Sequence, residues 1–257
     1  MTGYQKWISY YTMLRREFVR MIRIWSQTLL PPIVTTSLYF VVFGAFIGSQ
    51  LAAIEGYSYM QFIVPGLIMM SMITSSYMNT VSTFYFSKWQ RTLDEVLVSP
   101  TPNWIVIAGF VSGGMIRGLF VGTLVLLVSL LFTHLVIHQI LVLIFAGILT
   151  TMLFSLAGLI NGIFAKGFDG ISIVPTFVLT PLTYLGGVFY SVNQFPEFWR
   201  TVSLFNPILY MVNAFRYGFL GISDVSITLS FSLLIGLNIV LLGLTVYLFK
   251  KGWGFKN

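Results

Sequence analysis

Apolar runs of about 20 residues recur along this chain, and few charged residues interrupt them. A helix rises about 1.5 Å per residue, so such a run crosses the roughly 30 Å of hydrocarbon in a bilayer. Only 8% of the 257 residues are charged and 57% are hydrophobic, whereas soluble domains are about a quarter charged. The chain is therefore predicted to be an all-α, polytopic membrane protein, with residues 1–257 forming one membrane domain.

Six membrane spans are predicted from these runs. Their approximate bounds are 28–48, 60–86, 104–132, 139–165, 171–190 and 227–249. The first run exceeds the apolar region of a signal peptide, and no small-residue cleavage site stands out, so it is predicted to be retained. The apolar segments 196–205 and 207–220 are too short to cross, and we predict two short re-entrant helices on the external side.

Most of the positive charge falls on one side of the predicted spans. By the positive-inside rule, this places both termini and the 87–103 loop in the cytoplasm, with the bacterial inner membrane as the expected location. The net charge of +7 then reflects topology and not nucleic-acid binding. Eleven of the 14 basic residues lie on that side, and they are Lys6, Arg15, Arg16, Arg20, Arg23, Lys88, Arg91, Lys166, Lys250, Lys251 and Lys256.

An amphipathic helix is predicted at about residues 4–25, before the first span. Large apolar residues recur there every three or four positions, and basic residues fall largely between them, which is typical of a helix in the cytoplasmic interface. A cytosolic helix packed on a partner is the alternative. The apolar residues are Trp7, Tyr11, Leu14, Phe18, Ile22 and Trp25.

The segment "QRTLDEVLVSP", residues 90–100, places charges between the second and third spans. Ser87 followed by Gln90 has the form of a capping box, and Pro100 disfavours helix at the residue before it. We therefore predict a short helix at about 88–98.

This helix carries two kinds of side chain. Arg91 can pair with Asp94 and Glu95, three and four residues on, while Leu93, Val96 and Leu97 form an apolar ridge. Such a helix suits docking in a groove of another protein. A solvated turn between two spans is the alternative.

These segments together resemble the permease subunits of type-2 ABC exporters. The stretch "NPILYMVNAFR" matches the end of that family's signature at Pro207, Tyr210 and Arg216. Residues 59–71 and 177–191 add to the resemblance, which runs essentially from end to end.

The resemblance implies that the 88–98 helix is a coupling helix, inserted into a cleft of a separate ATP-binding subunit. Polar contacts would come from Arg91, Asp94 and Glu95, with Leu93 and Leu97 filling the groove. The family also implies a homodimer, or a heterodimer with a similar permease, and two ATPase subunits that bind ATP and Mg²⁺. Closure of those subunits would rock the spans and drive export.

The chain offers no energy source of its own. It has no G-x-x-x-x-G-K-[ST] phosphate loop, no H-E-x-x-H zinc motif and no cysteine, so we expect no catalytic, cofactor-binding or metal site. No Asp or Glu falls within a predicted span. An ion-gradient-driven secondary transporter stays open as an alternative, because sodium coupling can use backbone carbonyls.

A few polar residues lie inside the predicted spans. Arg117 costs about 2.5–3.5 kcal/mol at mid-helix, so it should face protein or water. It either lines the translocation pathway or pairs with a carbonyl or Asn of a neighbouring span, and Asn79 and Asn161 have the same two interpretations. Small residues predict close helix packing, within the protomer or at a dimer interface. They are Gly109, Gly113, Gly114, Gly118, Gly122, Gly158 and Gly162.

The external hairpin is aromatic, with Phe198 and Trp199 among its residues. It is either a gate for releasing an amphiphile or an interfacial anchor. The substrate class stays open among amphiphiles, lipid-linked molecules, drugs and polysaccharides.

Overall fold

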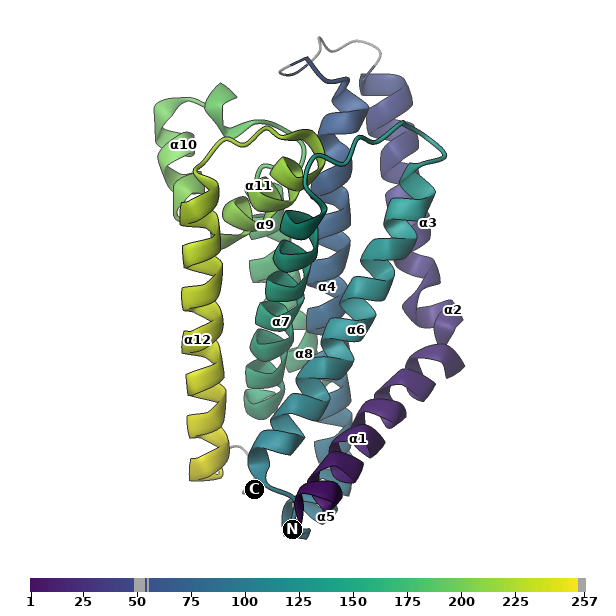
Figure 1. The fold of residues 1–257 in the computed structure, drawn as a ribbon, viewed down its shortest axis with the longest axis vertical. Coiled ribbons are helices and arrows are strands. Elements are labelled where there is room, and N and C mark those ends of the chain that lie inside the picture. Colours follow the sequence, from purple (N-terminus) through teal and green to yellow (C-terminus); the bar gives the residue numbers. More distant parts are fainter. Residues whose placement is uncertain (49–53, 55, 254–257) are drawn as a thin grey trace.

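A computed structural model describes residues 1–48, 54 and 56–253. Lys256, one of the basic residues used in the topology argument, lies outside the described residues. Apart from one isolated bridge between Ile54 and Tyr57, the regular elements of the described part are helices. The predicted all-α class is confirmed, and the long helices stand side by side in one bundle (Figure 1).

The described elements follow one another with short connections. In chain order they are α1 Gly3–Arg23, α2 Trp25–Thr28, α3 Leu30–Tyr39, the π-helical η1 Phe40–Ile47, α4 Tyr59–Trp89, α5 Thr92–Val98, α6 Asn103–Ser129, α7 Ile140–Phe164, α8 Phe168–Val174, the π-helical η2 Pro175–Leu179, α9 Thr180–Tyr184, the 3-10 turn η3 Val192–Gln194, α10 Glu197–Leu204, α11 Pro207–Leu220 and α12 Ile227–Lys251.

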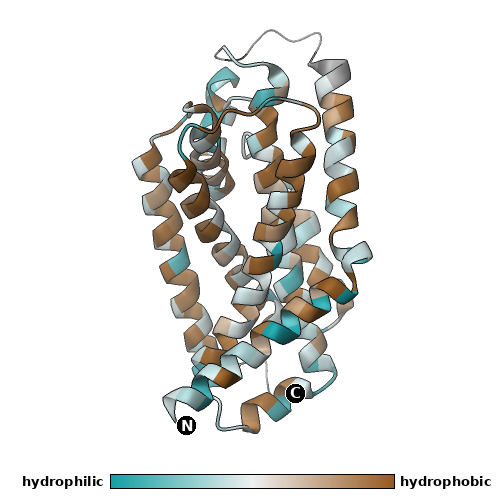
Figure 2. Cartoon of the chain, turned by 45° about the vertical axis from the view of Figure 1, so that its right-hand side comes forward, coloured by the Kyte–Doolittle hydropathy of each residue, from teal (hydrophilic) through white to brown (hydrophobic). Residues whose placement is uncertain are grey.

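Five helical stretches of the described chain are long and apolar enough to cross a membrane. They are Trp25–Gly44, Tyr59–Trp89, Asn103–Ser129, Ile140–Phe164 and Ile227–Lys251. Each overlaps one of the six predicted spans. Hydrophobic residues dominate these helices, and hydrophilic residues gather on α1 and near the two ends of the bundle (Figure 2).

The fifth predicted span, 171–190, differs from the prediction. Its helical part begins earlier, at Phe168, passes through the π-helical η2 and ends at Tyr184, at the lower limit of the about 17–25 residues of a membrane span; the sixth crossing stays a prediction. Pro175 and Pro181 interrupt the regular hydrogen-bond ladder. Gly187, with φ +72°, then turns the chain away from the helix direction.

The helix α4 forms the centre of the bundle and packs against α6, α7 and α11. Small residues allow the close approach. A Cβ on Gly114 would lie 2.1 Å from Thr80 Oγ1, and one on Gly158 would lie 2.6 Å from the Tyr77 carbonyl oxygen. These glycine contacts lie within one chain, which favours the intramolecular interpretation of the small-residue pattern.

Helix α1, predicted to be interfacial, runs obliquely along α6 (Figure 1). Its inner face fits two glycines of α6, because a Cβ on Gly109 would lie 2.9 Å from Met13 Cβ and one on Gly113 would lie 2.7 Å from Glu17 Cγ. Its outer face stays exposed and apolar, as a helix in the membrane interface requires. The exposed residues there include Trp7, Tyr11, Phe18 and Ile22.

Replacing Gly158 with Ala is expected to destabilise the bundle by about 1–2 kcal/mol, because the new Cβ overpacks the α4 backbone at Tyr77. Gly243→Ala in α12 is the matched control, since a Cβ there meets nothing within 4 Å. It should be neutral or slightly stabilising, because Ala favours helix over Gly. Thermal unfolding of both variants in detergent measures the difference, and equal melting temperatures would contradict the packing.

Candidate functional site

The predicted coupling helix begins later than expected. Helix α4 continues through Lys88 to Trp89, and α5 begins at Thr92. The capping box predicted from Ser87 and Gln90 is therefore wrong. Lys88 Nζ donates to the Ile163 carbonyl at 3.2 Å, a contact to α7 that favours continuing α4.

A tight turn separates α4 from α5. Arg91 has φ +60°, the one described non-glycine residue with a positive φ. The Thr92 hydroxyl donates to the Ser87 carbonyl at 3.2 Å and closes the turn. Because Arg91 lies outside the helix, the helical spacing to Asp94 and Glu95 is lost. Among the described residues, Arg91 takes part in no ion pair.

The two faces of α5 have different surroundings. Leu93 is 1% exposed and belongs to a buried cluster with Phe84 and Val106, and Leu97 packs against the same cluster. Leu93 is therefore an internal anchor and does not lie free to fill a groove in a partner. Val98, not predicted at this surface, is 88% exposed. The exposed surface of α5 and its turn consists of Gln90, Arg91, Asp94, Glu95 and Val98.

Arg117 is engaged by its own chain. Its Nη1 donates to Asn79 Oδ1 at 3.4 Å, and its Nη2 donates to the Thr28 carbonyl at 3.4 Å. These are the Asn and carbonyl partners of the structural alternative. Because Thr28 ends α2 and Asn79 lies in α4, Arg117 connects the first span to the centre of the bundle.

A second guanidinium reaches the same asparagine. Arg20 Nη2 donates to Asn79 Oδ1 at 3.1 Å and also to the Thr83 hydroxyl. Glu17, 4% exposed, forms an ion pair with Arg20 at 3.0 Å. Burial lowers the pKa of Arg20, and the neighbouring Glu17 opposes that effect.

We call Glu17, Arg20, Asn79, Thr83 and Arg117 the polar cluster. It holds the end of α1 against α4 and α6 by charged and polar contacts. Asn161 lies apart from it in α7 and donates to the Gly170 carbonyl in α8 at 3.2 Å. A pathway role for Arg117, Asn79 or Asn161 stays a prediction.

The signature residue Arg216 is buried in α11. It forms an ion pair with Asp224 at 3.4 Å, and both side chains are under 5% exposed. Its guanidinium lies 3.9 Å from the centroid of the Phe62 ring in α4, and it donates to the Gly187 carbonyl.

Asp224 joins this arginine to the segment 191–193. Its carboxylate accepts from the Val192 N–H at 3.2 Å, from Asn193 Nδ2 at 3.1 Å and from the Ser191 hydroxyl. The Arg216–Asp224 pair therefore ties α11, α4 and the 187–193 segment together.

The other two signature residues shape the start of α11. Pro207 occupies its first turn, where a missing N–H costs least. The Tyr210 hydroxyl donates to the Leu204 carbonyl at the end of α10, at 2.8 Å. Pro207 and Tyr210 therefore have a structural role in the connection between α10 and α11, whereas Arg216 joins α11 to α4 and to the 187–193 segment.

Phe198 and Trp199 lie in α10, which stands out from the bundle at the end opposite α5 (Figure 1). Both are exposed, at 69% and 49%. Their rings contact each other edge to face, with centroids 5.4 Å apart. The gate and the anchor both need such exposure, so the choice between them stays a prediction.

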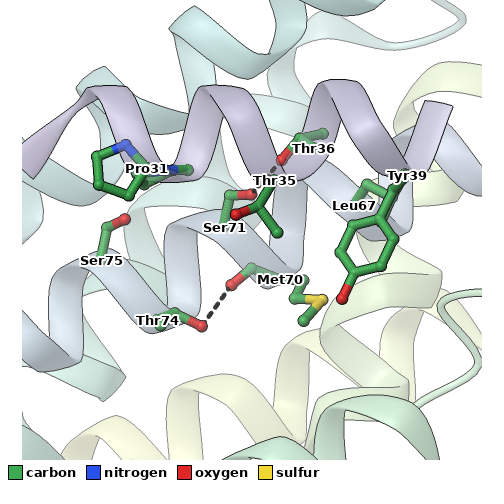
Figure 3. Close-up of a pocket in the computed structure, with 10 residues that line it drawn as sticks. Pro31, Thr35, Thr36, Tyr39, Leu67, Met70, Ser71, Thr74 and Ser75 are labelled. Atoms are coloured by element: carbon green, nitrogen blue, oxygen red, sulfur yellow. Dashed lines mark hydrogen bonds between the residues drawn. The ribbon is translucent and has the colours of Figure 1, made fainter. Parts of the chain in front are cut away.

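A groove between α3 and α4 contains residues that the sequence analysis missed (Figure 3). It has a volume of about 240 Å³, and we call it the hydroxyl groove. Figure 3 shows Tyr39 toward one end and Pro31 and Ser75 toward the other. None of Arg117, Asn79 and Asn161 lines it. The lining residues are Pro31, Pro32, Thr35, Thr36, Tyr39, Leu67, Met70, Ser71, Thr74 and Ser75.

A sequence signal for this groove was present. Ser71, Ser75, Asn79 and Thr83 recur at every fourth residue of the second span, so they share one face of a helix. The sequence analysis singled out only Asn79. Among the described residues, no group of three His, Asp or Glu side chains is arranged to hold a metal ion.

Comparison with known proteins covers nearly the whole chain. Residues 8–220 match the family described as "ABC-2 type transporter". The chain is 51% identical over 251 residues to the inner membrane transport permease YadH of Escherichia coli (strain K12), which covers 98% of each chain. It is 22% identical over 210 residues to nodulation protein J of Rhizobium leguminosarum bv. viciae, which covers 80% of each chain.

Proposed function

Because the chain belongs to the ABC-2 type transporter family, we propose that it is the permease subunit of an ABC exporter, driven by a separate ATP-binding subunit. The family resemblance found in the sequence is confirmed. The chain is a transport permease and not an enzyme, so ATP and Mg²⁺ would be bound by the partner.

The exposed surface of α5 is the observation that supports coupling. Arg91, Asp94, Glu95 and Val98 are accessible to a partner, while Leu93 holds the helix on α4 and α6. A short helix fixed in this way would pass a displacement of the partner directly to two spans. The partner would therefore contact the polar side chains around the exposed Val98, and not the apolar ridge that the helix-in-groove mode uses.

The proposed assembly is a homodimer with two ATPase subunits in the inner membrane, with both termini of each permease in the cytoplasm. The multi-pass architecture and the inner-membrane relative support this location. The direction of transport would be outward. Candidate substrates are an amphiphile, a lipid-linked molecule, a drug or a polysaccharide.

A charge reversal, Glu95→Arg, is expected to reduce copurification of the ATP-binding subunit about tenfold, because like charges across an interface cost affinity. Pull-down of the tagged permease, followed by quantification of the bound ATPase, measures the effect. Glu197→Arg is the matched control, since it makes the same charge change on the exposed surface of α10, at the far end of the molecule. Normal recruitment by Glu95→Arg would argue against α5 as the docking surface.

A further inference from the structure

We propose that the hydroxyl groove binds the uncharged, hydrogen-bonding headgroup of an amphiphile whose apolar part stays in the bilayer beside α3. This inference rests on the proposed function, because the ligand would be the molecule that the permease moves. A headgroup bearing several hydroxyls or amides has the required chemistry. The case depends on the hydrogen bonding, charge and size of the groove.

Ser75 differs from most of the other hydroxyl residues of α4, including Thr74, which also lines the groove. A Ser or Thr within a membrane helix ordinarily satisfies its hydroxyl by donating to a carbonyl of the preceding turn. In the described part of the chain, the Ser75 hydroxyl makes no such bond although the residue is only 4% exposed, and Thr35, an exposed residue across the groove, has no side-chain hydrogen bond either. The residues of α4 that do donate to the carbonyl four residues earlier are Thr74, Ser76, Thr80, Ser82 and Thr83.

Unsatisfied hydroxyls away from water are costly unless a ligand or ordered water bonds to them. Ser71 and Thr36 bond to each other across the groove at 3.3 Å, which holds α3 and α4 together without closing the space between them. Thr35 and Ser75 are left with donor and acceptor capacity toward the groove. A ligand with its own hydroxyl or amide groups would form hydrogen bonds with both hydroxyls.

The charge of the groove argues for a neutral ligand. None of its ten lining residues is charged, and a charged headgroup at membrane depth is stable only when it is paired. The polar cluster reaches α4 at Asn79, one helical turn from Ser75. The charged side chains of this cluster are already bonded within it. Arg20, for example, forms an ion pair with Glu17 and donates to Asn79.

The size of the groove indicates a headgroup and not a whole molecule. Sites for drug-sized ligands occupy about 300–1,000 Å³, and this groove measures about 240 Å³. Beside it, Val34 and Leu38 of α3 are exposed, at 48% and 59%, and could lie along an acyl or alkyl chain. Tyr39 ends the groove, hydrogen-bonded to the Tyr184 hydroxyl at 3.2 Å.

The proposal is tested by direct binding to the permease alone, extracted in polymer nanodiscs without alkyl glycoside detergent. Three radiolabelled probes share an octyl tail and differ in headgroup charge: octyl glucoside, octyl phosphate and octyltrimethylammonium. We expect saturable binding of octyl glucoside and at least about tenfold weaker binding of the two charged probes.

Thr35→Val with Ser75→Ala removes both unbonded hydroxyls at little change in shape. It should weaken octyl glucoside binding about tenfold, as expected for two lost hydrogen bonds. Thr12→Val with Ser37→Ala removes the same atoms on α1 and α3 outside the groove and should bind normally. Size-exclusion profiles and melting temperatures confirm that both double variants fold.

Three results would overturn the proposal: no saturable binding of octyl glucoside, octyl phosphate binding as tightly as the glucoside, or an unchanged affinity in the Thr35→Val, Ser75→Ala variant. Binding by the permease alone needs no ATP-binding subunit. This test can therefore fail while Glu95→Arg still impairs recruitment, and the reverse outcome is equally distinguishable.

Discussion

Replacing Arg216 with Met is expected to destabilise the protein by about 3–5 kcal/mol, the largest effect of any single change considered for this chain. Removing one partner of a buried ion pair leaves the other charge uncompensated. Here the residual charge is Asp224, whose side chain is 4% exposed. For a protein of this size, the melting temperature should fall by on the order of 10 °C.

Asp224 provides the test of this explanation. Changing it to Asn in the Arg216→Met background removes the stranded charge and keeps one of the two oxygens, which accept separately from Val192 and from Asn193. The double variant should therefore be more stable than Arg216→Met alone. Arg200→Met, at an exposed arginine of α10, should leave the melting temperature unchanged. A double variant that melts lower than Arg216→Met would refute the role of the pair.

Replacing Glu17 with Gln is expected to destabilise the protein by about 2–3 kcal/mol. The change keeps the shape of the side chain and removes the charge that compensates Arg20, while Arg117 shares the same Asn79 oxygen. The effect should fall below the usual cost of breaking a buried pair, because the Arg20 side chain is 32% exposed and solvent screens part of its charge.

Loosening of α1 is the structural result expected from Glu17→Gln. The sequence contains no cysteine, so a single Met13→Cys, placed where α1 meets Gly109, reports accessibility to a maleimide without background. Labelling should accelerate when Glu17→Gln is added. Glu197→Gln, an exposed glutamate of α10, is the matched control and should leave the rate unchanged. Equal labelling rates in all three proteins would exclude the polar cluster as the attachment of α1.

The predicted spans agree with the structure wherever a span depends only on local composition. Helices α4, α6, α7 and α12 each follow one apolar run, because the length of such a run alone decides whether a helix can cross the hydrocarbon. The two short segments predicted on the external side, 196–205 and 207–220, correspond to α10 and α11. Their dipping into the outer leaflet stays a prediction.

Errors appeared where local signals competed with packing. The Ser87–Gln90 pattern predicts a helix start, yet Lys88 bonds to the Ile163 carbonyl of α7 and α4 continues past it. The apolar run at 171–190 predicts a helix as far as residue 190, but the helix ends at Tyr184 and the chain turns at Gly187. In both places, contacts or backbone geometry outweighed a pattern read over a few residues.

The family could be recognised from the sequence, but the surroundings of its candidate residues could not. Arg91, Asp94 and Glu95 were predicted at an accessible surface, and they are exposed. Leu93 was predicted to face a partner and instead packs inside. The period of a helix defines which residues share a face, but it does not say which face meets the rest of the protein.

By itself, the sequence determined the membrane class, the helical fold and the family. The length of the apolar runs, the distribution of charge and the short motifs are all properties of the linear sequence. The tertiary structure decided which polar groups are satisfied. Thr36 is hydrogen-bonded to Ser71, and Arg20 to Asn79, across many intervening residues. The Ser75 hydroxyl has no hydrogen-bond partner among the described side chains. Hydrogen bonds depend on positions within a few tenths of an ångström, and only the packing of distant segments sets those positions.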